Sequence, residues 1–235
     1  MVFGQRAIGF RLGGAVFGLA ASIGFGWPAV AQLPPSQAEI AAYAGLHAAA
    51  HQGDMAALER ALAQKPELDA RDGHGRTALH VAAHAGRREI MRALVAAGAD
   101  PRALDGQLYD AITIAAVNDD VETMRVALAI GGDARAVTSP YAGTALIAAA
   151  HLGHDAVVKA LIAAGAPLDH VNNLGWTALI EAVILGDGGP RHVETARALV
   201  AAGARRDLAD RDGATPLDHA RRRGYAAMVA VLERR

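Results

Sequence analysis

The chain has 235 residues, of which 52% are hydrophobic, 4% are aromatic and 20% are charged, and its net charge at pH 7 is −1. This balance gives no basic surface of the kind that nucleic-acid-binding proteins need. The chain contains no cysteine, which excludes disulfides. Packing alone must therefore stabilise the fold.

Residues 1–31 have the composition of a secretory signal peptide. Arg6 and Arg11 precede an apolar run from Leu12 to Trp27, and Ala29-Val30-Ala31 follows. A positive start, an apolar middle and a small-x-small end predict cleavage after Ala31. An uncleaved membrane anchor is the alternative, because about 20 mostly apolar residues can span a bilayer. We expect a periplasmic or secreted protein that is not inserted in a membrane after cleavage.

Residues 32–42 form a lead-in that we expect to be a short linker. The sequence QLPPSQAE carries two prolines and mostly polar or small neighbours, as exposed loops do. Everything that follows, residues 43–235, has a different organisation.

The stretch from Asp72 to Ala103 contains two short predicted helices. The first begins at Thr77 and ends before Gly86, with a leucine and alanines on one face. The second has apolar residues at spacings of three and four and ends at Gly98, where a glycine can adopt the left-handed conformation. Helices this short are marginal in water. The pair must therefore bury its apolar faces against similar pairs.

Related units recur at steps of about 33 residues, with starts such as Thr144-Ala145-Leu146, Thr177-Ala178-Leu179 and Thr215-Pro216-Leu217. In these starts and in the Gly-Ala-Asp ends the units resemble ankyrin repeats. The resemblance implies an all-α solenoid of about six helix-turn-helix repeats. The expected boundaries are 43–71, 72–104, 105–137, 138–171, 172–209 and 210–235.

Histidines are the most enzyme-like feature of the sequence. His47 and His51, and again His80 and His84, are four residues apart on one predicted helix face and could bind zinc if their rings converged. The resemblance instead implies that His47 and His80 form structural hydrogen bonds to the neighbouring turn. His51, His84 and His151 share one variable repeat position, and Val117 interrupts this ladder. We expect neither a metal site nor a cofactor, and we expect no enzymatic activity.

The few aromatic residues after the leader predict a binding surface. Tyr109 and Trp176 directly precede the position that Thr77 defines, and Tyr141 lies three residues before Thr144. In ankyrin repeats these positions belong to the concave face and to the fingers, the loops that join consecutive repeats. Aromatic anchors often dominate protein interfaces. Packing of these rings between neighbouring fingers is the alternative.

We therefore predict a monomeric protein–protein interaction module that binds an unidentified protein partner through its concave face and fingers. A metal-binding or stress-protective accessory protein and a structural spacer are the alternative functions. The predicted partner-binding residues are Arg76, His84, Tyr109, Tyr141, His151, Asn173, Leu174 and Trp176.

Two departures from the repeat pattern also mark the second half. The fifth unit carries an extra Asp187-Gly188-Gly189-Pro190-Arg191, which is either a functional loop or a neutral extension. Glu181 stands where the repeat pattern keeps a small or apolar residue. A buried carboxylate needs a partner, and we expect Arg191 or His192 to provide it.

Overall fold

The computed structural model describes residues 33–233, so the expected signal peptide, the cleavage site and the last two arginines lie outside the described residues. Within that range the chain folds into α-helices and loops, apart from one isolated bridge between Val137 and Thr144. The helices are α1 (Gln37–Ala42), α2 (Gly45–Gln52), α3 (Met55–Leu62), α4 (Ala78–His84), α5 (Arg88–Ala96), α6 (Ala111–Val117), α7 (Val121–Ala129), α8 (Ala145–His151), α9 (Asp155–Ala163), α10 (Ala178–Ile184), α11 (Pro190–Ala201), α12 (Pro216–Arg222) and α13 (Ala226–Glu233). Between residues 33 and 233 no helix is long and apolar enough to cross a membrane.

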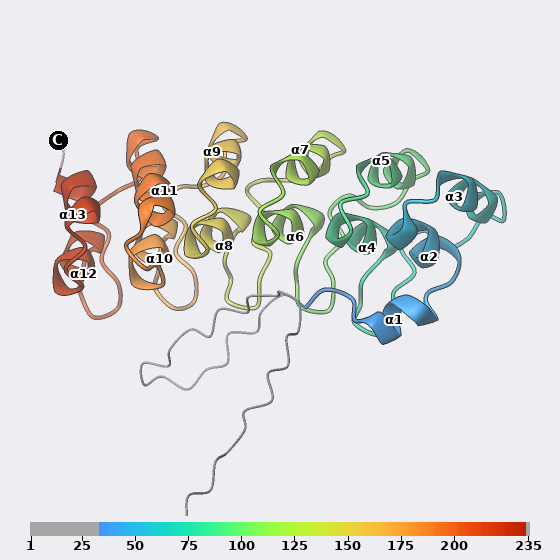
Figure 1. The fold of residues 1–235 in the computed structure, drawn as a ribbon, viewed down its shortest axis with the longest axis horizontal. Helices are drawn as coiled ribbons and strands as arrows, with labels where there is room; N and C mark the ends of the chain where they lie inside the picture. The colour runs from blue at the N-terminus through green and yellow to red at the C-terminus, as the bar shows by residue number, and fades with distance from the viewer. Residues whose placement is uncertain (1–32, 234–235) are drawn as a thin grey trace, which may run out of the picture. The chain divides into compact units, whose positions relative to one another are not determined.

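From α2 onward the helices form six pairs that stack side by side (Figure 1). The even-numbered helices α2 to α12 form an inner layer, and the odd-numbered helices α3 to α13 form an outer layer. Each helix contacts its pair partner and the corresponding helix of the next pair. The prediction of an all-α repeat solenoid is confirmed.

Alanine makes this stacking close. Consecutive alanines such as Ala82-Ala83 and Ala115-Ala116 are buried in the inner helices, where each contributes only a methyl group to the contact with the next helix. A leucine or isoleucine near each inner-helix start fills the core between the layers, as Leu79 and Leu146 do. Small residues shorten the distance between helix axes, and the stack therefore needs few aromatic residues.

The repeat that departs most from the pattern keeps its helix ends by other means. Asp110 stands where other repeats have threonine, and its carboxylate accepts the Thr113 amide at 2.7 Å, which caps α6. Asp119 stands where other repeats have glycine and adopts a φ of 58°. Aspartate tolerates this left-handed conformation better than most residues do. The third helix pair therefore folds like the others.

The lead-in differs from the expected linker, because residues 37–42 form helix α1. Ser36 caps it through a reciprocal pair of hydrogen bonds, in which the Glu39 amide donates to Ser36 Oγ at 3.3 Å and the Ser36 amide donates to Glu39 Oε2 at 2.8 Å. This capping box is a local signal for a helix start. The expectation of a linker throughout residues 32–42 is therefore wrong for residues 37–42.

Candidate functional site

Five fingers project on one side of the inner layer, at residues 72–76, 105–109, 139–143, 172–176 and 210–214, and in Figure 1 they lie below the inner helices. Main-chain hydrogen bonds join neighbouring fingers. The Gly106 amide donates to the His74 carbonyl at 2.9 Å, and the Asn173 amide donates to the Tyr141 carbonyl at 2.8 Å. These bonds join the first finger to the second and the third finger to the fourth, so a partner would meet groups that are already ordered.

Four of the predicted residues come together on the third and fourth fingers. Tyr141, Leu174 and Trp176 are partly exposed, and Asn173 is exposed. The side-chain oxygen of Asn172 accepts the amides of Leu174 and Trp176, both at 3.0 Å, which fixes the turn that presents the indole ring. We name this group, Tyr141, Asn173, Leu174 and Trp176, the Trp176 patch.

Leu108 was missed by the sequence interpretation and lies at the tip of the preceding finger. Its side chain is 49% exposed, and its φ is 66°. Gly75 and Gly175 occupy the equivalent positions of other fingers and also have positive φ. A left-handed conformation costs a non-glycine residue about 1–2 kcal/mol. Comparison of the repeats at this one position, where a leucine replaces glycine, could have identified the residue.

Two predicted partner-binding residues are not on the free surface. Tyr109 is 6% exposed because its ring packs into the continuous hydrophobic core. Arg76 is 2% exposed because α1 and its neighbouring finger residues surround the guanidinium group. Burial of aromatic area is favourable, and a ring next to an apolar cluster joins it. The expectation that the Tyr109 ring is exposed is wrong, and the roles of Tyr109 and Arg76 in partner binding stay predictions.

Arg76 is the centre of a charged network at the first finger. Its Nε donates to Asp72 Oδ2 at 2.7 Å, its Nη2 contacts the Glu39 carboxylate, and its Nη1 donates to the Leu33 carbonyl at 3.4 Å. Burial of Asp72 opposes its ionisation, but hydrogen bonds from the Arg76 amide, the Tyr43 hydroxyl and the Arg76 side chain outweigh burial and lower the pKa of Asp72 to about 2. Both carboxylates are thus held in the charged form.

A similar network lies beside the Trp176 patch. Glu181 is 5% exposed, and its Oε1 accepts the Asn172 side-chain amide at 2.7 Å. Its other oxygen is 3.3 Å from Nδ1 of His151, a predicted partner-binding residue of the preceding repeat. Arg191 and His192 were the expected partners of Glu181. That expectation is wrong, since both side chains turn toward other groups.

The histidines that start the inner helices are structural. His47 Nε2 lies 3.0 Å from the Arg76 carbonyl, and His80 Nε2 lies 3.1 Å from the Tyr109 carbonyl. The Thr77 amide donates to His80 Nδ1 at 3.1 Å, so the proton of the neutral ring is on Nε2. Each ring therefore links one repeat to the next finger, as the ankyrin resemblance implied.

His84 is different, because neither ring nitrogen has a hydrogen-bond partner although both are buried. Burial, together with the nearby charges of Arg76 and His80, lowers the pKa of His84 to about 4. Among residues 33–233 no three histidine or acidic side chains are grouped so that they could hold a metal ion.

The insertion in the fifth repeat connects several repeats. Arg191 Nη2 lies 2.6 Å from Asp119 Oδ2, two repeats earlier in the stack. His192 Nδ1 is 2.9 Å from Asp187 Oδ1, and its Nε2 is 3.0 Å from the His151 carbonyl. The Tyr225 hydroxyl donates to the Gly186 carbonyl at 3.1 Å. The extra residues thus contact the repeats on both sides.

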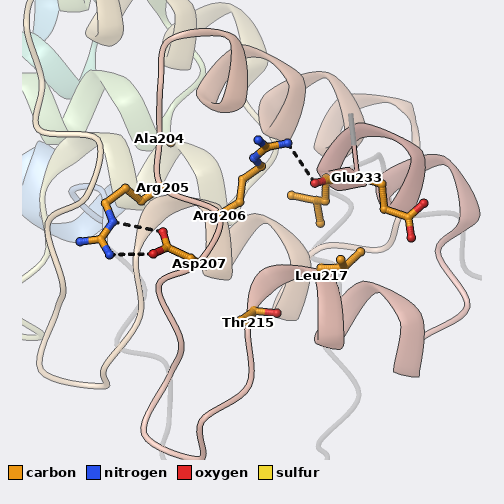
Figure 2. Close-up of a pocket in the computed structure, with 8 residues that line it drawn as sticks. Ala204, Arg205, Arg206, Asp207, Thr215, Leu217 and Glu233 are labelled. Atoms are coloured by element: carbon orange, nitrogen blue, oxygen red, sulfur yellow. Dashed lines mark hydrogen bonds and ion pairs between the residues drawn. The ribbon is translucent and has the colours of Figure 1, made fainter. Parts of the chain in front are cut away.

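A shallow hollow of about 700 Å³ lies at the C-terminal end (Figure 2). Three of its charged side chains bind groups that line it: Arg205 and Asp207 form a two-bond pair at 2.8 and 3.1 Å, and Arg206 Nη1 donates to the Leu232 carbonyl at 3.2 Å, whereas Glu233 pairs with Arg221. Thr215 accepts the Asp218 amide at 3.2 Å and caps α12. The hollow has no grouping of nucleophile, base and oxyanion donors.

A stack of six helix pairs, with hydrogen-bonded fingers on one side of the inner layer, defines a helical repeat protein. The family described as ankyrin repeats (3 copies) matches residues 19–105 and 112–210, and the chain belongs to the ankyrin-repeat family.

Solved structures show the same architecture. An ankyrin repeat domain from Acinetobacter baumannii AYE is 44% identical, with a TM-score of 0.74, and the alignment covers 80% of this chain and 95% of that one. The ankyrin repeat domain of Bcl-3, a member of the IkappaB protein family, is 28% identical, with a TM-score of 0.73, and the alignment covers 81% of this chain and 85% of that one.

A curated relative is the ankyrin repeat protein YahD of Escherichia coli (strain K12). It is 34% identical over 80 residues, which are 34% of this chain and 40% of YahD. The similarity therefore spans less than half of that protein. Ankyrin repeats generally mediate protein–protein binding, and proteins of this family are typically non-enzymatic.

Proposed function

We propose that this protein binds a protein partner through its concave face and fingers, with the Trp176 patch as the centre of the contact. The observation that carries the proposal is that Tyr141, Leu174 and Trp176 are partly exposed on two fingers joined by the Asn173–Tyr141 main-chain bond, with Leu174 and Trp176 held in the Asn172 turn. An ordered aromatic group loses little conformational freedom on binding, and such residues are common interface hot spots.

The neighbouring fingers extend this apolar surface. Leu108 projects from the tip of the second finger, and Val137 and Val171 are exposed in the loops that lead to the third and fourth fingers. Large apolar side chains that gather on one side of a soluble protein often mark an interaction site. At Leu108 the chain also adopts a strained backbone conformation, which supports a functional reason for the leucine.

The N-terminal sequence supports action outside the cytoplasm. The arginine-containing start, the apolar run and the Ala29-Val30-Ala31 end have the features of a cleavable secretory signal. The partner is accordingly a periplasmic or extracellular protein. As a separate part of the proposal, the module acts as a monomer.

The test is a comparison of Trp176→Ala with wild type in partner capture from the extracytoplasmic fraction, followed by affinity measurement with the captured protein. We expect the substitution to weaken binding by about 2 kcal/mol or more while the melting temperature stays constant. Asp212→Ala is the matched control, because Asp212 holds the tip position of the last finger that Leu174 holds in the fourth. If Trp176→Ala lowers binding only in proportion to the loss of folded protein, the indole ring stabilises the packing of the repeats and is not a binding anchor.

A further inference from the structure

Helix α1 lies against the first finger, below α2 and α4 in Figure 1, although none of its residues is buried. Its attachment is polar. The Glu39 carboxylate contacts Arg76 Nη2 and lies 3.2 Å from His74 Nε2, and the Leu33 carbonyl accepts from Arg76 Nη1. Arg76 itself is buried, but α1 contributes no buried residue, and an element attached by a few polar contacts opens more easily than the core does.

The surface under α1 has the chemistry of a carboxylate receptor. Asp72 holds only Nε of the Arg76 guanidinium, and the two Nη groups are directed at the lead-in. Arginine recognises carboxylates through such paired donors. The Tyr43 hydroxyl donates to Asp72 at 2.8 Å and so fixes the carboxylate that binds Arg76 Nε. Departure of α1 would leave Arg76 in place, with its two outer donor groups open.

Arg76 also belongs to the same row of the repeat as Trp176, directly before the threonine that caps each inner helix. A partner that lies along the concave face from the Trp176 patch toward the first repeat therefore meets α1. Its contact with Arg76 requires the lead-in to move.

We propose that α1 occupies the place of an acidic segment of the protein partner, and that Arg76 with His74 receives a carboxylate from the first turn of a partner helix, as it now receives Glu39. This inference rests on the proposed function. It makes α1 a tethered competitor, present at an effective concentration that short linkers raise to the millimolar range. Contacts at the Trp176 patch then supply the additional affinity that displaces it.

The test uses a matched pair of peptides and the full chain. The probe is an acetylated and amidated peptide of residues 33–44, and its control carries glutamine in place of Glu39. The receptor is the ¹⁵N-labelled Glu39→Gln protein, in which glutamine retains the capping box but loses the charge that faces Arg76. The shifts of the His74 and Arg76 signals in NMR spectra report binding at millimolar peptide.

We expect the acidic peptide to bind Glu39→Gln at least tenfold more tightly than the glutamine peptide does, and at least tenfold more tightly than it binds wild type. In the Glu39→Gln background, Arg76→Gln should remove the preference, and Arg76→Lys, which keeps the charge but not the paired donors, should reduce it severalfold. Circular dichroism of each variant shows whether the array is folded. Equal affinity for the two peptides, or no binding to folded Glu39→Gln, would overturn the proposal.

The result is separable from the test of the Trp176 patch. Trp176→Ala should leave binding of the acidic peptide unchanged, because the peptide corresponds to the lead-in alone. A protein that binds the acidic peptide but captures its partner equally well with Trp176→Ala would retain the carboxylate site and lose the proposed patch. Partner capture that depends on Trp176, with no preference for the acidic peptide, would support the Trp176 patch and overturn the carboxylate site.

Discussion

His84 makes the stability of the array depend on pH. Both ring nitrogens are buried without hydrogen-bond partners, and the pKa is lowered from 6.5 to about 4. The folded state therefore resists protonation, while the unfolded chain takes up a proton below pH 6.5. The stability present above pH 6.5 is lost as pH falls toward 4. For this pair of pKa values the loss is about 2 kcal/mol at pH 5 and about 3 kcal/mol at pH 4.

His84→Leu tests this reasoning. Val117 and Ile184 occupy the equivalent positions of other repeats, so the stack already accepts aliphatic side chains there. Removal of an unsatisfied buried polar group should raise the free energy of unfolding by about 1 kcal/mol or more at pH 7. The difference from wild type should grow by about 2 kcal/mol at pH 5, since only wild type has this imidazole.

The assay is urea unfolding followed by circular dichroism at pH 7 and pH 5, at one ionic strength. Subtraction of the wild-type free energies cancels the contributions of all other titrating groups, since the two proteins share them. Val117→Leu is the matched control, because it changes the same helical position without a titratable group, and its difference from wild type should not vary with pH. A His84→Leu difference that is equal at pH 7 and pH 5 would refute the argument.

Three further outcomes follow from the same structure. Leu108→Gly should leave the free energy of unfolding within about 0.5 kcal/mol of wild type, because relief of the left-handed conformation offsets the greater freedom of glycine in the unfolded chain. A loss of more than about 1 kcal/mol in urea unfolding would contradict the argument that Leu108 is strained. Arg191→Ala should lower the unfolding free energy by less than about 1 kcal/mol, and by still less in 1 M salt, because the ion pair of Arg191 with Asp119 is largely exposed. A loss of about 2 kcal/mol or more that salt does not change would show that this ion pair contributes more to stability than an exposed pair does. Intact-mass measurement of the natively expressed protein should give a chain that begins at Gln32, and retention of residues 1–31 in the membrane fraction would favour the anchor.

The fold was predictable because its signals are local and repeated. A threonine at four of the six inner-helix starts and a glycine after most helices recur with nearly constant spacing, and the structure places Thr77 and Thr144 as N-caps. Asp110 and Asp119 break this pattern, yet each supplies the cap or the left-handed turn that its position needs. Chemistry at single positions was therefore enough for the helices of the repeats, though not for α1.

Exposure and pairing in the candidate site were less predictable, because they depend on contacts between distant residues. Arg76 is covered by the lead-in, and its contact with Glu39 joins residues 37 positions apart. Arg191 was expected beside Glu181 but pairs with Asp119, 72 positions away. The position of a residue within one repeat does not specify which neighbour meets its side chain.

Glu181 has a consequence for the order of the units. Its carboxylate is bound by Asn172 of its own repeat and lies beside His151 of the repeat before it. In the last repeat the corresponding pair is Asp210 and His219, whose carboxylate and imidazole are 2.7 Å apart. A copy of the fifth repeat transplanted behind the third would find Val117 in place of His151. Its buried carboxylate would then lose one of two polar neighbours, which is destabilising. The units are thus not interchangeable, and permuted or duplicated arrays should tolerate a junction only where these side chains remain matched.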